Sequence, residues 1–319
     1  MTTETGGAAE STATHADTKS EAAAKPRSDL DTARRVYAEE IRVKAGLRSR
    51  ALFEAFAAVP REHYLGPGPW LIKKGGRGPL HKLGKRLRGE YRLTADADPR
   101  RIYGDVHVAI DAKRGLNNGR PGRLARWLDL LELRAGERAL HVGCGVGYYT
   151  AIMAEVVGPR GQVVGVEIDA ALAERARKNL SHFAHVEVLH ADGGEVGAGA
   201  FDAIFVNAGA THPRTVWLDG LRRGGRLVLP LTAEDGRGAL LRVAFDGRAH
   251  AASFVSTARV FHCAGSRDAE AGRLLREALR RADRSAVRSL RRDAHEADAT
   301  CWLHLEGCCL STLPTGREG

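Results

Sequence analysis

The chain has 319 residues, enough to bury a sizeable core as one large domain with appendages or as two domains. It contains no apolar run near the roughly 20 residues that cross a bilayer, and its N-terminus lacks a secretory apolar core, so we expect a cytoplasmic protein without a membrane partner. Its five cysteines lack zinc-type spacing and predict free thiols in a reducing compartment, and no metal site is expected. The net charge of +10 comes mainly from arginine and does not by itself indicate nucleic-acid binding.

The N-terminal part divides by composition. Residues 1–27 are rich in small and polar residues, without apolar periodicity, and predict a disordered tail. A helix is predicted from a capping box at Ser28 to Gly46, followed by a second helix over 49–58. We treat 28–124 as N-terminal helices plus a substrate loop.

A basic insert at residues 73–92 carries eight basic residues against one acidic residue. Apart from Tyr91 near its end, it has no aromatic residues interleaved with the basic ones on which bases could stack, so a solvated surface loop is favoured over a nucleic-acid arm. Nucleic acid is therefore not an expected partner, and a monomer is favoured.

A glycine turn dominates the centre of the chain. The stretch 138–150 reads as a buried strand, a turn and the start of a helix, with Gly143, Gly145 and Gly147 at alternate positions. Glycine permits a sharp bend and close approach of a ligand, and the helix N-terminus offers free N–H groups. The pattern G-x-G-x-G differs from the dinucleotide fingerprint, because Tyr148 stands where the last glycine would be.

An acidic residue, Glu167, ends the next predicted strand, at the place where a carboxylate can bind ribose hydroxyls. This context favours S-adenosylmethionine as the cofactor. NAD and a purely structural turn remain as alternatives.

Strands and helices alternate after the turn, which predicts an α/β fold with a mostly parallel sheet and helices on both faces. Strands 239–245 and 252–263 follow each other without a helix and predict an antiparallel pair at the sheet edge. The preceding elements are expected at 162–168 (strand), 169–180 (helix), 185–190 and 201–206 (strands), 214–221 (helix) and 225–231 (strand).

From about Asp29 to Gly265 the chain resembles the protein-L-isoaspartate O-methyltransferase family, which has a Rossmann-like class I methyltransferase fold with a seven-stranded sheet. The matching segments are AFAAVPREHYL, LHVGCGVGYYTAIMAEVVG, VVGVEID, VEVLHADGG, FDAIFVNAGATHP, LRRGGRLVLPL and VSTARVFHC. The resemblance implies S-adenosyl-L-methionine as cofactor and an S-adenosylmethionine-binding domain over residues 125–265.

The resemblance also implies positions for the cofactor. The glycine turn would hold its methionine part, Glu167 its ribose, and Asp192 would approach its adenine. Asp192 could instead only form a turn, and Asn207 only an Asx-turn. The full set of predicted cofactor-binding residues is Gly143, Cys144, Gly145, Gly147, Tyr148, Glu167, Ile168, Asp192, Gly193 and Asn207.

The substrate segment departs from the family pattern. Family members carry a G-Q-T-I-S-Q-P-type loop whose serine lies at the substrate, and here Gly119 stands at the serine position. The catalytic residue is therefore unassigned, and a Gly119→Ser change is expected to raise activity on isoaspartyl peptides. The predicted substrate-binding residues are Asn117, Asn118, Gly119, Arg120 and Pro121.

Residues 266–319 lie beyond the resemblance. An amphipathic helix is predicted over 268–284, with a stripe of arginines on its outer face, and then short strands ending in a hairpin with its tip at Glu306 and Gly307. A cap docked over the sheet is favoured over a substrate-recruiting element.

We expect an S-adenosylmethionine-dependent carboxyl O-methyltransferase of the isoaspartyl type, acting on a peptide, protein or small-molecule carboxylate. A carboxylate nucleophile is already ionised near neutral pH, so no general base is needed. The alternatives are an enzyme for one specific peptide or small-molecule carboxylate, and an RNA-binding methyltransferase. NAGATHP after the fourth strand is not the Asn/Asp-Pro-Pro-aromatic motif of amine methylation.

Overall fold

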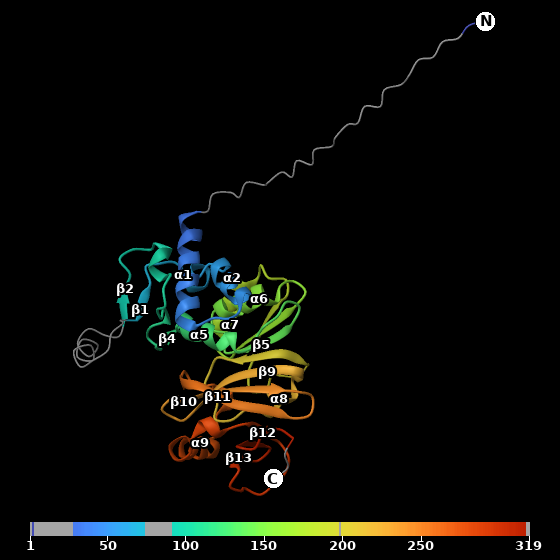
Figure 1. Cartoon of the computed structure of the whole chain (residues 1–319). Coiled ribbons are helices and arrows are strands. Elements are labelled where there is room, and N and C mark those ends of the chain that lie inside the picture. The colour runs from blue at the N-terminus through green and yellow to red at the C-terminus, as the bar shows by residue number, and fades with distance from the viewer. Residues whose placement is uncertain (1, 3–27, 74–90, 198, 317–319) are drawn as a thin grey trace.

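The computed structural model describes residue 2 and residues 28–73, 91–197 and 199–316 (Figure 1). The predicted disordered tail and most of the basic insert lie outside these residues. Within the described part of the chain, no helix is long and apolar enough to cross a membrane.

Three helices open the fold. Helix α1 (Asp29–Ala45) begins with the predicted capping box of Ser28 and ends at Gly46, which is left-handed with φ of 64°. Glycine adopts this conformation without strain, so the helix ends where the sequence indicated. Helices α2 (Arg50–Ala58) and α3 (Glu62–Leu65) follow.

A small irregular region connects these helices to the main sheet. Arg61 is fully buried there and donates hydrogen bonds to the carbonyl oxygens of Ile102, Gly104 and Val106, at 2.6, 3.1 and 2.8 Å. The buried guanidinium thus fixes the loop that leads to the substrate segment. The elements are β1 (Leu71–Lys73), β2 (Tyr91–Leu93), η1 (Pro99–Ile102), β3 (Ala109–Asp111) and β4 (Leu116–Asn117), with β1–β2 and β3–β4 as antiparallel pairs.

The main sheet has a parallel half and an antiparallel half. Strands β9, β8, β5, β6 and β7 are parallel neighbours in that order. Strands β10 and β11 pair antiparallel beyond β9. The bounds are α5 Pro121–Asp129, β5 Arg138–Val142, α6 Tyr148–Val157, β6 Gln162–Glu167, α7 Ala170–Leu180, β7 Val186–His190, β8 Phe201–Val206, α8 Thr215–Asp219, β9 Leu221–Thr232, β10 Arg237–Phe245 and β11 His250–Arg259.

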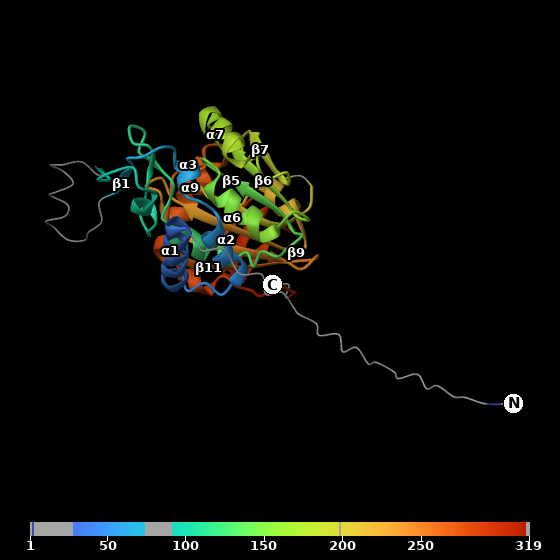
Figure 2. The same cartoon turned by 90° about the horizontal axis from the view of Figure 1, so that it is seen from above.

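Apolar residues fill both faces of this sheet. Ala139 of β5 belongs to the apolar cluster that includes residues of α1, α2, α5 and α6, whereas Leu140 and Val142 of the same strand belong to the cluster that includes residues of α8 and α9. Successive residues of a strand point to opposite faces, so the predicted helices on both faces are confirmed. Figure 2 shows α6 and α7 beside β5 and β6 on one of these faces.

The C-terminal region extends the sheet. The expected edge pair is not at the edge, because β12, β14 and β13 continue the sheet beyond β11 and bring it to ten strands. The expectation of seven strands was wrong because β12 hydrogen-bonds to β11, and β14 and β13 then add to β12 in turn instead of capping the sheet. The elements are η2 (Ala264–Ser266), α9 (Ala269–Arg281), η3 (Arg284–Ala286), β12 (Ser289–Arg291), β13 (Cys301–Leu305) and β14 (Cys308–Ser311).

These C-terminal elements belong to the apolar core on the face of the sheet that α8 and α9 cover. Leu275, Leu290 and Trp302 are buried in one cluster with Leu140 of the central strand. Figure 1 shows α9, β12 and β13 at the opposite end of the molecule from α1.

Candidate active site

The glycine turn joins β5 to α6, and its three glycines all have positive φ, of 75°, 58° and 90° at Gly143, Gly145 and Gly147. An added Cβ at Gly147 would lie 2.7 Å from Leu180 of α7, so this glycine is required for helix packing. An added Cβ at Gly145 would meet nothing within 4 Å. The turn therefore opens a space in front of Gly145, next to the N-terminus of α6.

Glu167 is held against this turn. It ends β6, is only 8% exposed, and accepts hydrogen bonds from the N–H of Gly145 at 2.8 Å and of Asp169 at 3.1 Å. An ionised carboxylate has about four acceptor sites, so two remain for a ligand's hydroxyls. Next to it the apolar Ile168 is 47% exposed and offers a surface for a flat ring.

Asn207 and Asp192 lie on the neighbouring strand ends. The N–H of Asn207 donates to Val142 at 2.8 Å, and an added Cβ at Gly143 would lie 3.7 Å from the Asn207 carbonyl carbon. Asp192 accepts from the N–H of Gly194 at 2.8 Å, which is the turn that the sequence allowed. The Gly193 carbonyl accepts from the indole N–H of Trp217 at 2.8 Å.

Two predicted cofactor residues direct their side chains away from the turn. The Tyr148 ring is fully buried among the N-terminal helices, with its hydroxyl 3.2 Å from that of Tyr37. Cys144 packs its sulfur toward Gly165 in the sheet, and burial raises the pKa of its thiol. Only the backbone of these two residues can contact a ligand in the turn.

The substrate segment lies beside the cofactor turn. Arg114, in the β3–β4 turn, pairs with Asp169 at 2.6 Å, two residues after Glu167. At the other end an added Cβ on Gly119 would lie 3.8 Å from the Tyr149 ring of α6. The structure therefore brings the predicted substrate loop to the predicted cofactor turn.

Individual loop residues have distinct surroundings. Asn117 accepts from the N–H of Gly119 at 3.0 Å, and Pro121 is the buried first residue of α5. Arg120 forms an ion pair with Asp105 at 2.8 Å, so its charge is balanced within the protein. Asn118 is 6% exposed and its side-chain Nδ2 has no hydrogen-bond partner among the described residues.

Gly119 is left-handed, with φ of 65°, and an added Cβ would lie 3.1 Å from Leu124. Serine would be strained there and would press against a buried leucine. The structure therefore argues against the expected gain from Gly119→Ser.

Positive charge gathers at this loop. Burial, followed by the charges of Lys73, Arg123 and Arg120, lowers the pKa of His107 to about 4, so this imidazole is neutral near pH 7. Arg123 donates to the Arg259 carbonyl at 3.1 Å and forms no ion pair within the described ranges. Such surroundings favour an anionic group.

The sequence reasoning missed three residues of this region: Arg114, Tyr149 and Asp169. The Tyr149 hydroxyl is buried without a partner in the described part of the chain, and burial raises the pKa of Tyr149 well above its ordinary value. It is thus a protonated donor beside the loop. Asp169 could have been noticed as a cap-forming residue type at the start of the helix predicted over 169–180, where the structure has it as the N-cap.

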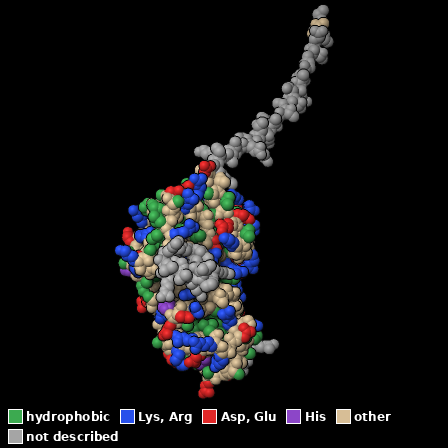
Figure 3. Space-filling model, turned by 90° about the vertical axis from the view of Figure 1, so that its left-hand side faces the viewer, with side chains coloured by type: hydrophobic (Ala, Val, Ile, Leu, Met, Phe, Trp, Pro, Cys, Tyr) green, Lys and Arg blue, Asp and Glu red, His purple; other side chains and the backbone are tan. Residues whose placement is uncertain are grey.

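Acidic neighbours neutralise part of the arginine stripe predicted on α9. Arg273 pairs with Glu270 and Glu277, each at 2.6 Å, and Arg276 pairs with Glu234. On the face in Figure 3, basic and acidic side chains are interspersed. The exposed Arg280 and Arg284 form no ion pair among the described residues, so part of the stripe remains a basic surface.

Solved structures share this fold. One protein-L-isoaspartate O-methyltransferase structure matches with a TM-score of 0.56 and 23% identity, over 80% of this chain and 71% of that one. Another, from Plasmodium falciparum and assigned to the same enzyme type in complex with S-adenosyl-L-homocysteine, matches with a TM-score of 0.55 and 19% identity, over 72% and 97%. The fold is thus that of the Rossmann-like class I methyltransferases.

Sequence relatives define the family. A family model described as Protein-L-isoaspartate(D-aspartate) O-methyltransferase matches residues 93–259. Protein-L-isoaspartate O-methyltransferase 1 of Archaeoglobus fulgidus is 34% identical over 207 residues, which is 64% of this chain and 81% of that protein. The enzyme of Ignicoccus hospitalis is 38% identical over 145 residues, or 44% and 68%.

The chain therefore belongs to the protein-L-isoaspartate O-methyltransferase family, and its cofactor is S-adenosylmethionine. This confirms the resemblance and the cofactor inferred from the sequence. The family match ends at residue 259, so η2, α9 and strands β12 to β14 lie outside it.

Proposed function

We propose that the open space before Gly145 holds S-adenosylmethionine, with Glu167 binding the ribose and Ile168 and Asp192 flanking the adenine. The support is Glu167, whose carboxylate accepts two backbone N–H groups beside that space and retains two acceptor sites. Gly143 and Asn207 would line the methionine side. When bound, the cofactor supplies an electrophilic methyl group on a sulfonium.

The acceptor in this proposal is a side-chain carboxylate of a peptide or protein, with an isoaspartyl residue as the first candidate. The observation that carries it is the position of the loop 115–121, joined to the cofactor strand end by Arg114 and Asp169. The unpartnered Nδ2 of Asn118 and the Tyr149 hydroxyl can each donate to a carboxylate, and Arg123 adds positive charge. The chain's contribution is orientation and exclusion of water, since an ionised carboxylate needs no base.

One difference from the family pattern, Gly119 in place of serine, favours a second class of acceptor. Gly119 gives a carboxylate only a backbone N–H where the family pattern has a serine hydroxyl, so the pocket has a different shape. A specific peptide or a small-molecule carboxylate is therefore the alternative acceptor. None of the five cysteines forms a disulfide, which suits the reducing cytoplasm that we propose as the protein's location.

The test supplies labelled cofactor with an isoaspartyl peptide, its normal aspartyl twin and bulk tRNA. Base-labile label on the isoaspartyl peptide is expected. Base-stable label on tRNA, with no ester on any carboxylate, would refute the proposal.

A variant tests the loop itself. Asn118→Ala should lower kcat/KM for the acceptor about 5- to 150-fold, because a buried carboxylate loses a donor worth about 1–3 kcal/mol. Cofactor affinity should stay unchanged. Lys113→Ala, in the exposed β3–β4 turn, is the matched control.

A further inference from the structure

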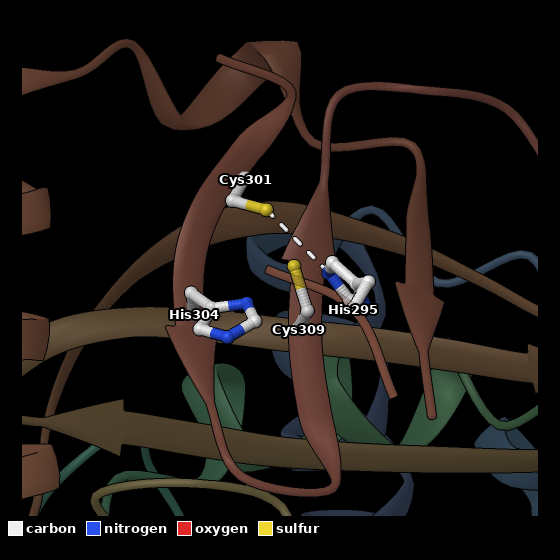
Figure 4. A group of neighbouring side chains, drawn as sticks. All are labelled: His295, Cys301, His304 and Cys309. Carbon is white, nitrogen blue, oxygen red and sulfur yellow. Dashed lines mark hydrogen bonds between the residues drawn. The ribbon is translucent and has the colours of Figure 1, made fainter. Parts of the chain in front are cut away.

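Four potential metal ligands come together at the far edge of the sheet, outside the family match. They are His295, Cys301, His304 and Cys309, and one ligand atom from each lies within 4.8 Å of the others. Figure 4 shows the four side chains converging, with Cys301 and His304 on β13, Cys309 on β14 and His295 on the segment before them. Two sulfur and two imidazole ligands are a set typical of structural zinc sites.

A β-bulge explains how two of these residues meet. Cys301 and His304 are three positions apart, so a regular strand would direct them to opposite faces. The pairing of β13 with β14 shifts register between Cys301 and Leu303, and an extra residue there re-aims the side chains. His304 is directly opposite Cys309 in this pair, which places both on the same face.

The separation of Cys301 and His295 suits a tetrahedral ion. The Cys301 sulfur lies 3.5 Å from Nε2 of His295. Zinc–sulfur and zinc–nitrogen bonds of about 2.3 and 2.05 Å at a tetrahedral angle imply a sulfur–nitrogen separation of about 3.6 Å. The Cys301 sulfur and the Nε2 of His295 therefore need almost no movement to bind the ion.

The surroundings already orient two ligands. Nδ1 of His295 lies 2.9 Å from the Asp293 carbonyl, which accepts its hydrogen and leaves Nε2 unprotonated toward Cys301. The backbone N–H of Asp298 donates to the Cys301 sulfur at 3.4 Å.

Of the other two ligands, the Cys309 thiol donates to the neighbouring Leu310 carbonyl, at 3.8 Å, and His304 has a ring nitrogen unpaired among the described residues. His304 has a buried Nδ1 without a hydrogen-bond partner in the described structure, and Cys309 is 1% exposed. A buried imidazole nitrogen left unpaired is costly unless something binds there.

We propose that this cluster is a structural zinc site that ties the segment around His295 to the β13–β14 hairpin. Four protein ligands leave no open position, so the ion would be structural and not catalytic. On binding, the Cys301 and Cys309 thiols each release a proton to solvent and the two thiolates neutralise the charge of Zn²⁺. In the metal-free chain the Cys301 thiol can donate to the Asp298 carboxylate, 3.5 Å away.

The spatial order of the sheet separates this site from methyl transfer. Strands β13 and β14 lie at one edge, and β12, β11, β10, β9 and β8 stand between them and β5. The proposal is therefore independent of the proposed acceptor, and its tests measure metal and stability instead of turnover.

The first experiment measures metal content of the full chain, purified under reducing conditions, by elemental analysis. About one zinc per chain is expected for the parent. Cys309→Ala and His304→Ala should each lose it. Cys308→Ala is the matched control, because Cys308 is adjacent and buried but packs into the apolar core of the opposite face, and it should keep its zinc.

The second experiment does not depend on how the variants fold. Chelator-stripped parent chain titrated with Co²⁺ should develop the intense visible bands of a tetrahedral ion and a thiolate charge-transfer band. Zinc should then displace the cobalt. Removal of zinc should lower the melting temperature of the parent chain.

Each of the following results would overturn the proposal. They are a stripped parent chain that takes up neither ion, full zinc content in folded Cys309→Ala, and a Cys301–Cys309 disulfide in the freshly purified protein. Loss of zinc from folded Cys308→Ala would equally remove the assignment.

Discussion

The guanidinium of Arg114 lies 2.6 Å from the carboxylate of Asp169 and joins the β3–β4 turn to the N-terminus of α7. Asp169 also caps α7, accepting from the N–H of Leu172 at 3.0 Å. Because Glu167 lies only two residues before it, one ion pair connects the substrate loop with the residue proposed to bind ribose.

The Arg114–Asp169 ion pair should affect turnover of the acceptor because it holds the substrate loop in position. Arg114 is about half exposed, so the pair should add only about 0.2–1 kcal/mol to stability. A double-mutant cycle of Arg114→Ala and Asp169→Asn should give a coupling of similar size in kcat/KM for the acceptor, whereas Lys113→Ala should have no such coupling. Additive effects of the two changes would show that the ion pair does not position the loop.

Glu167→Gln should weaken S-adenosylmethionine binding by about 1.5–3 kcal/mol, roughly 10- to 150-fold in Kd, because ribose hydroxyls lose a charged acceptor. The amide oxygen can still accept from Gly145, so the turn should persist. Calorimetric titration measures the affinity, and Glu187→Gln on the neighbouring strand is the exposed control. Unchanged affinity in a folded Glu167→Gln chain would exclude the assigned role.

Gly145→Ala should block the cofactor space. Gly136 offers a matched control, because both glycines have positive φ and an added Cβ would meet nothing within 4 Å at either. Each alanine should cost about 1–2 kcal/mol of stability through backbone strain. Only Gly145→Ala should also lose cofactor affinity in the same titration. Equal affinities in the two variants would place the cofactor elsewhere.

His141 should make the protein sensitive to acid. It is fully buried on β5, with Nδ1 2.9 Å from the Thr150 hydroxyl, and burial lowers the pKa of His141 to about 3. Between that value and the ordinary value of about 6.5, the unfolded chain binds a proton that the folded chain does not. The free energy of unfolding should therefore fall as pH falls, by up to about 1.4 kcal/mol per pH unit from this group.

Urea unfolding at several pH values below neutrality measures this slope. His141→Phe, which can still stack near Phe205, should show a shallower slope than the parent, while exposed His182→Gln should keep the parent slope. Parallel slopes in His141→Phe and the parent would contradict the prediction.

Local signals allowed much of this molecule to be predicted. The bounds of α1 follow from a cap at Ser28 and a left-handed Gly46, and the tight turn between β5 and α6 follows from its three glycines. Helix α8 ends before the predicted residue 221 because Leu221 already pairs with Phe201 in the sheet. Strand pairing of this kind depends on tertiary contacts, which the spacing of apolar residues in the sequence does not indicate.

Distant partners could not be predicted in the same way. Arg114 and Asp169 belong to different elements, and no local pattern couples them. Likewise, β12 to β14 could be recognised as strands, but not as a continuation of the main sheet. The spacing of His295, Cys301, His304 and Cys309 matched no zinc pattern because a bulge, invisible in the sequence, brings them to one face.

The contact between Gly265 and Asp192 has a consequence for how the two ends of the molecule communicate. An added Cβ at Gly265 would lie only 1.5 Å from the Asp192 carboxylate, and the next residue, Ser266, accepts a hydrogen bond from Thr211 at 3.2 Å. The segment that leads into α9 thus forms a wall of the proposed adenine pocket. By thermodynamic linkage, a ligand that orders Asp192 should slow amide hydrogen exchange in η2 and the first turn of α9, well beyond the residues that it touches.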